Sequence, residues 1–319
     1  MNRLLQVLSV ILMITGSFMP LNASASDGAQ KSVLVTGAST GIGRNLAETL
    51  AAAGHHVYAG ARKDEDLAAL NEIKNITAVR LDVTSQEDID AVVALIKARG
   101  TGLYALVNNA GIGGGGMIVD TPVEVQSLVY DVNVEGVYRV TKTIAPLIVA
   151  SKGRISTTGS IAGTLSWPGG SAYSGSKHWI EAFTDSLAGE MAPHGVQVSV
   201  IEPGNFQSHI RRNSALRDQA RVVADGGVIT AEMKKQYKET VAVELSYKLP
   251  NEVSSAYMHA LFDEAPLRRY MVAPSAEAQA STISTKFQQL LQLNDWGPYS
   301  FSREELKKML DEALASHKD

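Results

Sequence analysis

The sequence predicts an α/β protein, a doubly wound (Rossmann-type) parallel sheet of about seven strands with helices on both faces and extra C-terminal helices. Short apolar segments alternate strictly with helical patterns from Lys31 to Gly204. The apolar segments are nearly continuous, as expected for strands that helices cover on both faces. A glycine-rich turn follows the first segment and opens the first helix, which completes the pattern of this fold class.

The order of the elements follows from local patterns. A helix, "R-N-L-A-E-T-L-A-A-A-G", follows the glycine turn, and a polar helix covers about residues 64–74. Ser85 is the expected N-cap of a third helix, with Asp88 at its third position. A long helix is predicted over about residues 123–148, and the next one ends near Ala192. The strands between them are "K-S-V-L-V", "H-V-Y-A-G-A", "T-A-V-R-L-D-V", "Y-A-L-V-N-N-A-G", "G-R-I-S-T-T-G-S" and "V-Q-V-S-V-I-E-P-G".

The alternation stops after Gly204. Residues 205–250 are polar and mostly helical in pattern, which indicates an insertion rather than a repeat. A helix, "N-E-V-S-S-A-Y-M-H-A-L-F", and a last strand, "R-R-Y-M-V-A", follow it. From Ser275 the pattern predicts one or two amphipathic helices, the second with Ser302 as its cap. We therefore expect one α/β domain over residues 26–274, with its insertion, and a helical extension over residues 275–319.

Composition excludes several classes of function. The chain has 319 residues and a net charge of −4, with no broad basic face for nucleic acid. It contains no cysteine, so disulfides, thiolate metal sites and a cysteine nucleophile are excluded. The seven histidines show no metal-binding spacing, and no metal site is expected.

The N-terminus has the layout of a secretory signal peptide. Arg3 precedes an apolar run from Leu4 to about Met19, and Ala23-Ser24-Ala25 is a small-x-small cleavage pattern. The run is too short and too polar for a stable membrane span. Residues 1–25 are therefore expected to direct export to the periplasm or the medium. An uncleaved anchor remains open, as does a start at Met19 that gives a cytoplasmic protein.

The turn "T-G-A-S-T-G-I-G" predicts a nucleotide site. It lies between a strand and a helix, which is the context that a dinucleotide fold needs. Gly37 allows the tight turn, Gly41 lets the backbone approach a pyrophosphate, and Gly43 lets the helix pack closely. The free N–H groups of the helix N-terminus then face the phosphates.

A second motif, "S-A-Y-S-G-S-K-H-W", places Tyr173 four residues before Lys177, on one helix face. A free tyrosine has a pKa of about 10, and a nearby cation lowers it. The pair is thus expected to act as a general acid and base. Ser160 ends the fifth strand, where such sheets bind ligands, and can hold a substrate oxygen. The plainer alternative for Ser160 is a strand-end cap.

The G-x-x-x-G-x-G spacing, together with Ser160, Tyr173 and Lys177, resembles the short-chain dehydrogenase/reductase family. The resemblance covers about residues 31–274. It implies hydride transfer between NADP(H) and a carbonyl or alcohol, with Tyr173 moving the proton and Lys177 holding the nicotinamide ribose. The motif "Y-D-V-N-V-E-G-V-Y" implies that Asn133 is the fourth catalytic residue, in a proton relay.

The resemblance also implies the cofactor site. Arg62 follows the second strand where a carboxylate would favour NAD, and a guanidinium there favours the 2′-phosphate of NADP. The alternative is a solvated loop charge at Arg62, with NAD as the cofactor. Ser208 stands where the family commonly has threonine. The expected cofactor-binding residues are Gly37, Ser39, Thr40, Gly41, Ile42, Gly43, Arg62, Asp82, Val83, Asn109, Ala110, Gly111, Tyr173, Lys177, Pro203, Gly204, Phe206 and Ser208.

The substrate is expected to be a hydrophobic ketone or alcohol, framed by the loop after Ser160 and by the insertion. Trp167 and Phe206 offer apolar surface there. "I-E-P-G-N-F" and "R-R-Y-M-V-A-P" resemble the retinol and 17β-hydroxysteroid branch of the family. The insertion also carries arginines that either bind an acidic substrate group or, as we expect, form a solvated helix face; they are Arg211, Arg212, Arg217 and Arg221.

Two points stay open at the level of function. The family usually forms homodimers or homotetramers through the helices of Asn133 and Tyr173, and the extra C-terminal helices could cover either surface. A non-enzymatic nucleotide-binding sensor or scaffold can use the same fold, since a fold alone does not fix a function. The sequence does not determine the identity of the substrate or the direction of the reaction.

Overall fold

Seven parallel strands form one sheet in the order β3-β2-β1-β4-β5-β6-β7, which confirms the predicted fold class. The computed structural model describes residues 30–316, so the expected signal peptide lies outside the described residues. The strand order reverses between β1 and β4, and such a point leaves a crevice at the carboxyl ends of the strands. The strands are β1 (Ser32–Val35), β2 (His56–Ala61), β3 (Ile76–Arg80), β4 (Ala105–Asn108), β5 (Arg154–Thr158), β6 (Gln197–Pro203) and β7 (Arg269–Val272).

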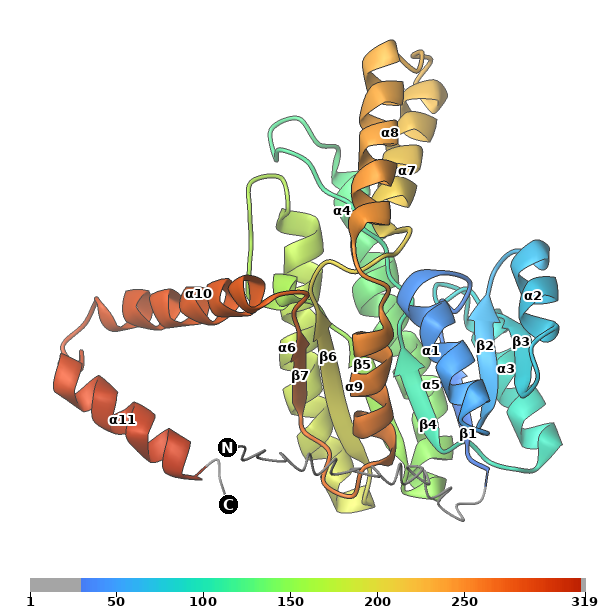
Figure 1. Cartoon of the computed structure of the whole chain (residues 1–319), viewed down its shortest axis with the longest axis horizontal. Coiled ribbons are helices and arrows are strands. Elements are labelled where there is room, and N and C mark those ends of the chain that lie inside the picture. Colours follow the sequence, from blue (N-terminus) through green and yellow to red (C-terminus); the bar gives the residue numbers. More distant parts are fainter. Residues whose placement is uncertain (1–29, 317–319) are drawn as a thin grey trace, which may run out of the picture.

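Helices cover both faces of the sheet (Figure 1). Strand side chains alternate between the two faces, so Val33 and Val35 pack into one core layer and Leu34 into the other. The first layer is closed by α1 (Gly41–Ala52), α2 (Asp64–Asn71) and α9 (Asn251–Phe262). The second is closed by α3 (Gln86–Arg99), α5 (Gly136–Ser151) and α6 (Ser171–Met191). The predicted N-cap is confirmed, because the Ser85 hydroxyl accepts a bond from the Asp88 N–H.

The helix predicted over residues 123–148 contains an unpredicted π turn. The structure has α4 (Val123–Tyr130), the π turn η1 (Asp131–Glu135) and then α5. A π turn adds one residue to a helical turn and changes the direction in which its side chains point. Asn133 lies in this turn and is almost fully buried. No hydrophobic period reveals such a turn, because the helix continues on both sides of it.

The insertion is a helical hairpin that projects from the edge of the sheet (Figure 1). It consists of α7 (Ile210–Ala224) and α8 (Ala231–Ser246), as the polar helical pattern predicted. Gln207 closes its base. The Gln207 N–H donates to the Lys248 carbonyl at 2.8 Å, and its side-chain amide donates to the carbonyls of Leu245 and Tyr247.

The C-terminal extension forms two helices, α10 (Ala276–Asn294) and α11 (Arg303–Ser316), which lead away from the sheet (Figure 1). Ser302 caps α11 as predicted, because its side chain and that of Glu305 each bond the other's backbone N–H. Gln289 of α10 donates to the carbonyl of Thr164, next to the expected active-site loop. Within residues 30–316, no helix is long and apolar enough to span a membrane.

Candidate active site

A cavity of about 660 Å³ opens at the carboxyl edge of the sheet. Its walls come from the glycine turn, the loops after β3, β4 and β5, the start of α6, and the beginning of the insertion. Every residue predicted to bind the cofactor lines it, and so does Ser160. The cavity therefore joins a dinucleotide-sized groove to the residues expected to do chemistry. Asn133 is not part of its lining.

Backbone geometry explains two of the glycines in the turn. Gly37 has a φ of +65°, and a Cβ there would lie 2.7 Å from the Cα of Ala110. A Cβ on Gly43 would lie 2.4 Å from the Gly37 carbonyl oxygen. The start of α1 therefore packs on the turn itself. The Thr40 side chain makes no capping bond, so the first N–H groups of α1 are available to an anion.

The turn is held in place by a residue that the sequence analysis missed. The buried Thr36 hydroxyl accepts bonds from the N–H groups of Asn109 and Ala110, at 3.0 and 2.9 Å. The Asn109 side-chain amide donates hydrogen bonds to the carbonyls of Thr36 and Gly37. The loops after β1 and β4 are thus fixed to each other. A threonine directly before the first glycine of the turn was the available signal.

Lys177 is a buried cation in the first half of α6. Its ammonium donates to the carbonyl of Thr158 at 2.7 Å and lies 5.7 Å from the centre of the Tyr173 ring. Burial lowers the pKa of Lys177 to about 8, and the negative charge of Glu181 acts in the opposite direction. The predicted pair therefore shares one end of the cavity, and its lysine loses its proton more easily than a free one.

The phenol of Tyr173 differs from the expectation. Burial raises its pKa, whereas the hydrogen-bonding Ser160 hydroxyl and the positive charge of Arg211 lower it. Lys177 is not among these influences. The prediction that Lys177 makes this phenol more acidic is thus wrong for this structure, because the lysine ammonium is directed to Thr158. The group whose charge acts on the phenol comes from the insertion.

Ser160 lies two residues beyond the end of β5 rather than inside the strand. It caps the short 3₁₀ helix η2 (Ile161–Gly163), since its hydroxyl accepts a bond from the Ala162 N–H at 3.0 Å. The hydroxyl also lies 3.5 Å from the Pro203 carbonyl, to which it can donate. The structure thus contains both features considered for Ser160, a cap and a hydroxyl facing the cavity beside Tyr173.

Asn133 connects the π turn to the catalytic helix. Its side chain accepts a bond from the Ile112 N–H at 2.8 Å and donates to the Ile112 carbonyl at 2.9 Å. It also donates to the hydroxyl of Ser176 at 3.1 Å, which in turn donates to the carbonyl of Tyr173. Asn133 is therefore linked to the backbone of Tyr173 through Ser176 rather than directly.

Residues 31–219 match the family described as short chain dehydrogenase. This chain is a short-chain dehydrogenase/reductase. It is 34% identical over 269 residues to the mitochondrial D-beta-hydroxybutyrate dehydrogenase of Mus musculus, covering 78% of each chain. It is 35% identical over 215 residues to retinol dehydrogenase 16 of Rattus norvegicus, covering 66% of this chain and 67% of that one.

The fold agrees with the family. The structure is similar to a short-chain dehydrogenase/reductase from Burkholderia phymatum in complex with NAD, with a TM-score of 0.70 and 25% identity. The alignment covers 85% of this chain and 98% of that one. The chain is therefore an oxidoreductase that uses a nicotinamide cofactor on alcohols or carbonyls, and not a sensor or scaffold alone. The glycine turn, the free N–H groups of α1 and the ammonium of Lys177 fit such a cofactor.

In this dehydrogenase/reductase, the part of the cavity expected to bind the adenosine of the cofactor contains an arginine, Arg62, that forms an ion pair with Asp82. The Arg62 guanidinium is 66% exposed and lies 3.3 Å from the Asp82 carboxylate. Burial of Asp82 favours its neutral form, but bonds from Thr84 and the charge of Arg62 outweigh this effect and lower the pKa of Asp82. An exposed ion pair of this kind contributes little stability, so Arg62 can exchange its partner for an anionic ligand.

The insertion of the dehydrogenase/reductase supplies charge to the cavity. Arg211 and Arg217 line it, whereas Arg212 pairs with the buried Glu244 and Arg221 with Asp218. The prediction of one solvated arginine face is thus wrong for Arg212, whose side chain is only 18% exposed, and for Arg217, which is partly buried and donates to the Gly113 carbonyl. Local spacing could not identify the partners of Arg212 and Arg217, because these lie on α8 and in the loop after β4.

The apolar wall differs in part from the expectation. Phe206 is only 4% exposed and packs into the core layer of α1 and α9. Trp167 is 50% exposed at the cavity and keeps apolar surface available. In the described part of the chain, no three carboxylate or imidazole groups are close enough to hold a metal ion.

Proposed function

We propose that this enzyme is an NADP(H)-dependent reductase and dehydrogenase of ketones and secondary alcohols with an apolar body. The observation that carries the proposal is that Ser160, Tyr173 and Lys177 meet in the cavity that the glycine turn also lines. NADP(H), when bound, supplies or accepts the hydride. The Ser160 hydroxyl donates a hydrogen bond to the substrate oxygen, and the Tyr173 phenol gives its proton to the same oxygen during reduction. The Lys177 ammonium would hold the nicotinamide ribose of the bound cofactor.

The preference for NADP(H) is supported by charge at the end of β2. No carboxylate follows Ala61 there, and Arg62 lines the cavity. Arg80 donates to the Arg62 carbonyl and pairs with Asp64, which holds the Arg62 backbone beside the end of β3. A 2′-phosphate matches this arrangement better than a 2′-hydroxyl, because a guanidinium binds phosphate oxygens in pairs.

An apolar substrate is supported by the side chains beyond the catalytic residues. Ile161, Leu165, Trp167 and Tyr247 line that part of the cavity. The relative retinol dehydrogenase 16 is named for an apolar alcohol, retinol. Aliphatic and aromatic walls of this kind bind a substrate through the area that they remove from water.

A hydroxy acid is the second candidate, and Arg211 is the observation that favours it. Arg211 lines the cavity, and its charge acts on the Tyr173 phenol. A carboxylate a few atoms from the reacting oxygen could pair with this guanidinium. The relatives named D-beta-hydroxybutyrate dehydrogenase carry such an acid in their names.

One assay separates the candidates. Purified protein is given NADPH or NADH with retinoid and steroid ketones, with small ketones, and with 3-oxo acids. If the main proposal is correct, kcat/KM is highest for NADPH with an apolar ketone. If Arg211 binds a substrate carboxylate, kcat/KM is highest for 3-oxo acids, and Arg211→Gln removes this preference. Tyr173→Phe should lower kcat by at least about 100-fold and leave cofactor binding unchanged. Equal turnover by this variant would refute the assigned chemistry.

We also propose a homodimer or homotetramer built through α5 and α6. Tyr138 is 54% exposed on α5, and the rings of Trp179 and Phe183 stack on α6 beside it. Light scattering of the purified protein should report at least twice the monomer mass. A Tyr138→Glu variant should shift it toward the monomer.

Export remains a proposal that rests on the N-terminal sequence. Mass spectrometry of the protein isolated from its own cells is expected to give a first residue after Ala25. A first residue at Met19 would instead establish a cytoplasmic start, and one at Met1 an uncleaved segment.

A further inference from the structure

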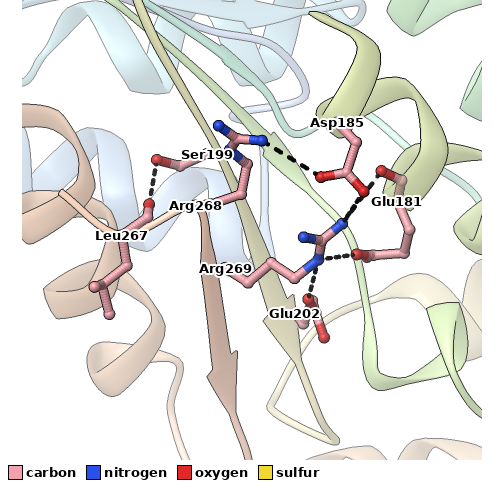
Figure 2. Close-up of polar contacts among 7 residues, drawn as sticks. All are labelled: Glu181, Asp185, Ser199, Glu202, Leu267, Arg268 and Arg269. Carbon is pink, nitrogen blue, oxygen red and sulfur yellow. Dashed lines mark hydrogen bonds and ion pairs between the residues drawn. The ribbon is translucent and has the colours of Figure 1, made fainter. Parts of the chain in front are cut away.

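Figure 2 shows a cluster of charged side chains that brings together α6, β6 and the segment around the start of β7. Glu181 and Asp185 come from α6, Glu202 from β6 and Arg269 from the start of β7, and Arg268 directly precedes that strand. Only 18% of the Glu181 side chain and 8% of the Glu202 side chain are exposed. None of these residues lines the cavity. The cluster is therefore not used by the chemistry described above, and two of its carboxylates are withdrawn from water.

The Arg269 guanidinium joins the acids. Its Nε lies 3.0 Å from Oε2 of Glu181 and 3.9 Å from Oε1 of Glu202. Its Nη2 donates to Asp185 at 2.7 Å, and Arg268 reaches the same carboxylate at 3.6 Å. The two exposed groups, Asp185 and Arg268, thus form the outer part of the cluster. Glu181 and Glu202 form its inner part and share a single guanidinium nitrogen.

The inner pair lacks enough positive charge and enough donors for two carboxylates. Oε1 of Glu181 is buried and has no hydrogen-bond partner. An unpaired buried acceptor costs about 1–3 kcal/mol, and a carboxyl proton on Glu202 would satisfy it. Burial and the negative charge of Glu181 raise the pKa of Glu202 to about 7, against the opposing charges of Arg269 and of Lys286 on α10. Geometry and charge thus both favour one proton on the pair.

Glu181 packs against the loop that carries Ser160. A Cβ on Gly159 would lie 3.2 Å from Oε1 of Glu181, and a Cβ on Gly163 would lie 3.0 Å from it. These glycines lie on either side of Ser160, so the carboxylate supports the backbone that carries the hydroxyl. Glu202 directly precedes Pro203, whose carbonyl faces the same hydroxyl.

The pair also acts on the catalytic lysine. Glu181 follows Lys177 by four residues on α6, which puts both on one helix face. Its negative charge raises the pKa of Lys177 against the effect of burial. A change in the charge of the inner pair therefore changes the electrostatic environment of Lys177.

We propose that Glu181 and Glu202 share one proton, and that Arg269 clamps this pair as a set of positioning residues beneath Ser160 and Lys177. As the pH rises through neutrality, the proton leaves to solvent, and two buried negative charges then repel each other. Because Glu181 packs against Gly159 and Gly163, the repulsion shifts the loop that carries Ser160.

Four other charged groups face the pair. Lys177 and Asp185 face it from α6, Arg269 from β7, and Lys286 from α10. The two cations on β7 and α10 favour the ionised form and act against the rise in the pKa of Glu202. Asp185 has its own guanidinium contacts, which lower its pKa, and it stays ionised throughout.

The first experiment measures the shared proton without any substrate. Infrared difference spectra between about pH 5.5 and pH 9 should show the loss of a protonated carboxyl C=O band in the wild type. The band should be absent in Glu202→Gln, where the amide imitates the protonated acid, and present in Asp185→Asn, the matched exposed control. A wild-type spectrum without the band, or a band unchanged in Glu202→Gln, would overturn the proposal.

The second experiment follows kcat against pH with any ketone that the enzyme reduces. The wild type and Asp185→Asn should show an inflection near pH 7, and Glu202→Gln should lose it while keeping the kcat of the low-pH plateau within about twofold. A profile of Glu202→Gln that superimposes on the wild type contradicts the proposal. Because the infrared arm needs no turnover, a wrong substrate assignment does not affect it.

The clamp is tested with the two neighbouring arginines. Arg269→Leu should lower kcat by about tenfold or more, with the dissociation constant of the cofactor changed by less than about twofold. Arg269→Lys should restore part of the loss, and Arg268→Leu should have no effect on kcat. Full kcat in a folded Arg269→Leu protein would remove the clamp from the proposal. If that variant does not fold, Arg269→Lys and Glu202→Gln still decide the outcome.

Discussion

At the scale of residues, the site depends on one buried cation. Lys177 is withdrawn from water and has a protein carbonyl, that of Thr158, as its hydrogen-bond partner. Burial of a charge is costly unless the charge is used or paired. Glu181, the acid whose charge acts on Lys177, lies one turn further along α6. The position of Lys177 beside Tyr173 is thus a functional arrangement that weakens the fold locally.

Lys177→Met should therefore separate activity from stability. Turnover is expected to fall by at least about 100-fold, since the nicotinamide ribose would lose the cation proposed to hold it in position. The melting temperature should stay within a few degrees of the wild type, since removal of a buried charge offsets the lost bond to Thr158. Steady-state kinetics and calorimetry check the two parts. Lys97→Met, on the exposed face of α3, is the control, and a large loss of activity there would contradict the assignment.

Arg62→Glu should invert the cofactor preference. A carboxylate at this position repels a 2′-phosphate, so KM for NADPH is expected to rise about tenfold or more while KM for NADH changes little. Kinetics with both cofactors measure the ratio. Lys63→Glu places the same charge one residue further along, on an exposed lysine that pairs with Glu65. If the two variants change the ratio equally, Arg62 does not recognise the phosphate.

At the scale of elements, the π turn η1 holds together three parts of the active site. It lies between α4 and α5, and Asn133 within it bonds to the loop after β4 and to α6. All three bonds of its side chain are made in a buried place, where an unpaired group is expensive. A regular helix would turn this amide in another direction. The turn is therefore part of the scaffold of the site.

Asn133→Ala should loosen this scaffold. Loss of the amide leaves the N–H and carbonyl of Ile112 without partners, and the free energy of unfolding is expected to fall by about 2–3 kcal/mol. Turnover should fall with it, because Ser176 and the adjacent turn of α6 lose a contact. Urea denaturation measures the first effect. Asn133→Asp retains the acceptor oxygen for the Ile112 N–H but buries a charge against the Ile112 carbonyl, so it should be at least as damaging at neutral pH. Wild-type stability in either variant would contradict this explanation.

At the scale of the whole molecule, two buried titrating groups give the stability a characteristic pH dependence. Glu202 binds its proton more tightly in the folded state, with a pKa of about 7 instead of 4.5, so stability falls as the pH rises between these values. Lys177 binds its proton less tightly when folded, with a pKa of about 8 instead of 10.5. Stability therefore recovers as the pH rises from about 8 to 10.5.

This dependence is measurable. Thermal unfolding followed from about pH 4 to pH 10 should show a minimum between neutrality and pH 8. Glu202→Gln should remove the fall on the acid side, and Lys177→Met should remove the rise on the alkaline side. A wild-type curve that increases steadily from pH 5 to pH 8 would show that Glu202 is not protonated in the folded state.

The sequence predicted the parts of the molecule whose signals are local. The alternation of strands and helices, the glycine turn and the spacing of Tyr173 and Lys177 each lie within a few residues. The Arg269 cluster was not predicted, because Glu181 and Arg269 are 88 positions apart and only the sheet brings them together. The charge of Arg211 on Tyr173 likewise arises from the fold of the insertion, and the direction of the Lys177 ammonium depends on a backbone carbonyl that carries no sequence signal.

The base of the α7–α8 hairpin has a consequence for how this enzyme could diversify. The chain enters and leaves the hairpin at one point, where Gln207 and Lys248 are joined through their backbones. A segment tethered in this way can be exchanged for another of different length without rerouting the strands on either side. Recombination at the base of the hairpin would pass on Ser160, Tyr173 and Lys177 and would exchange the arginines of the insertion that line the cavity, and with them the specificity.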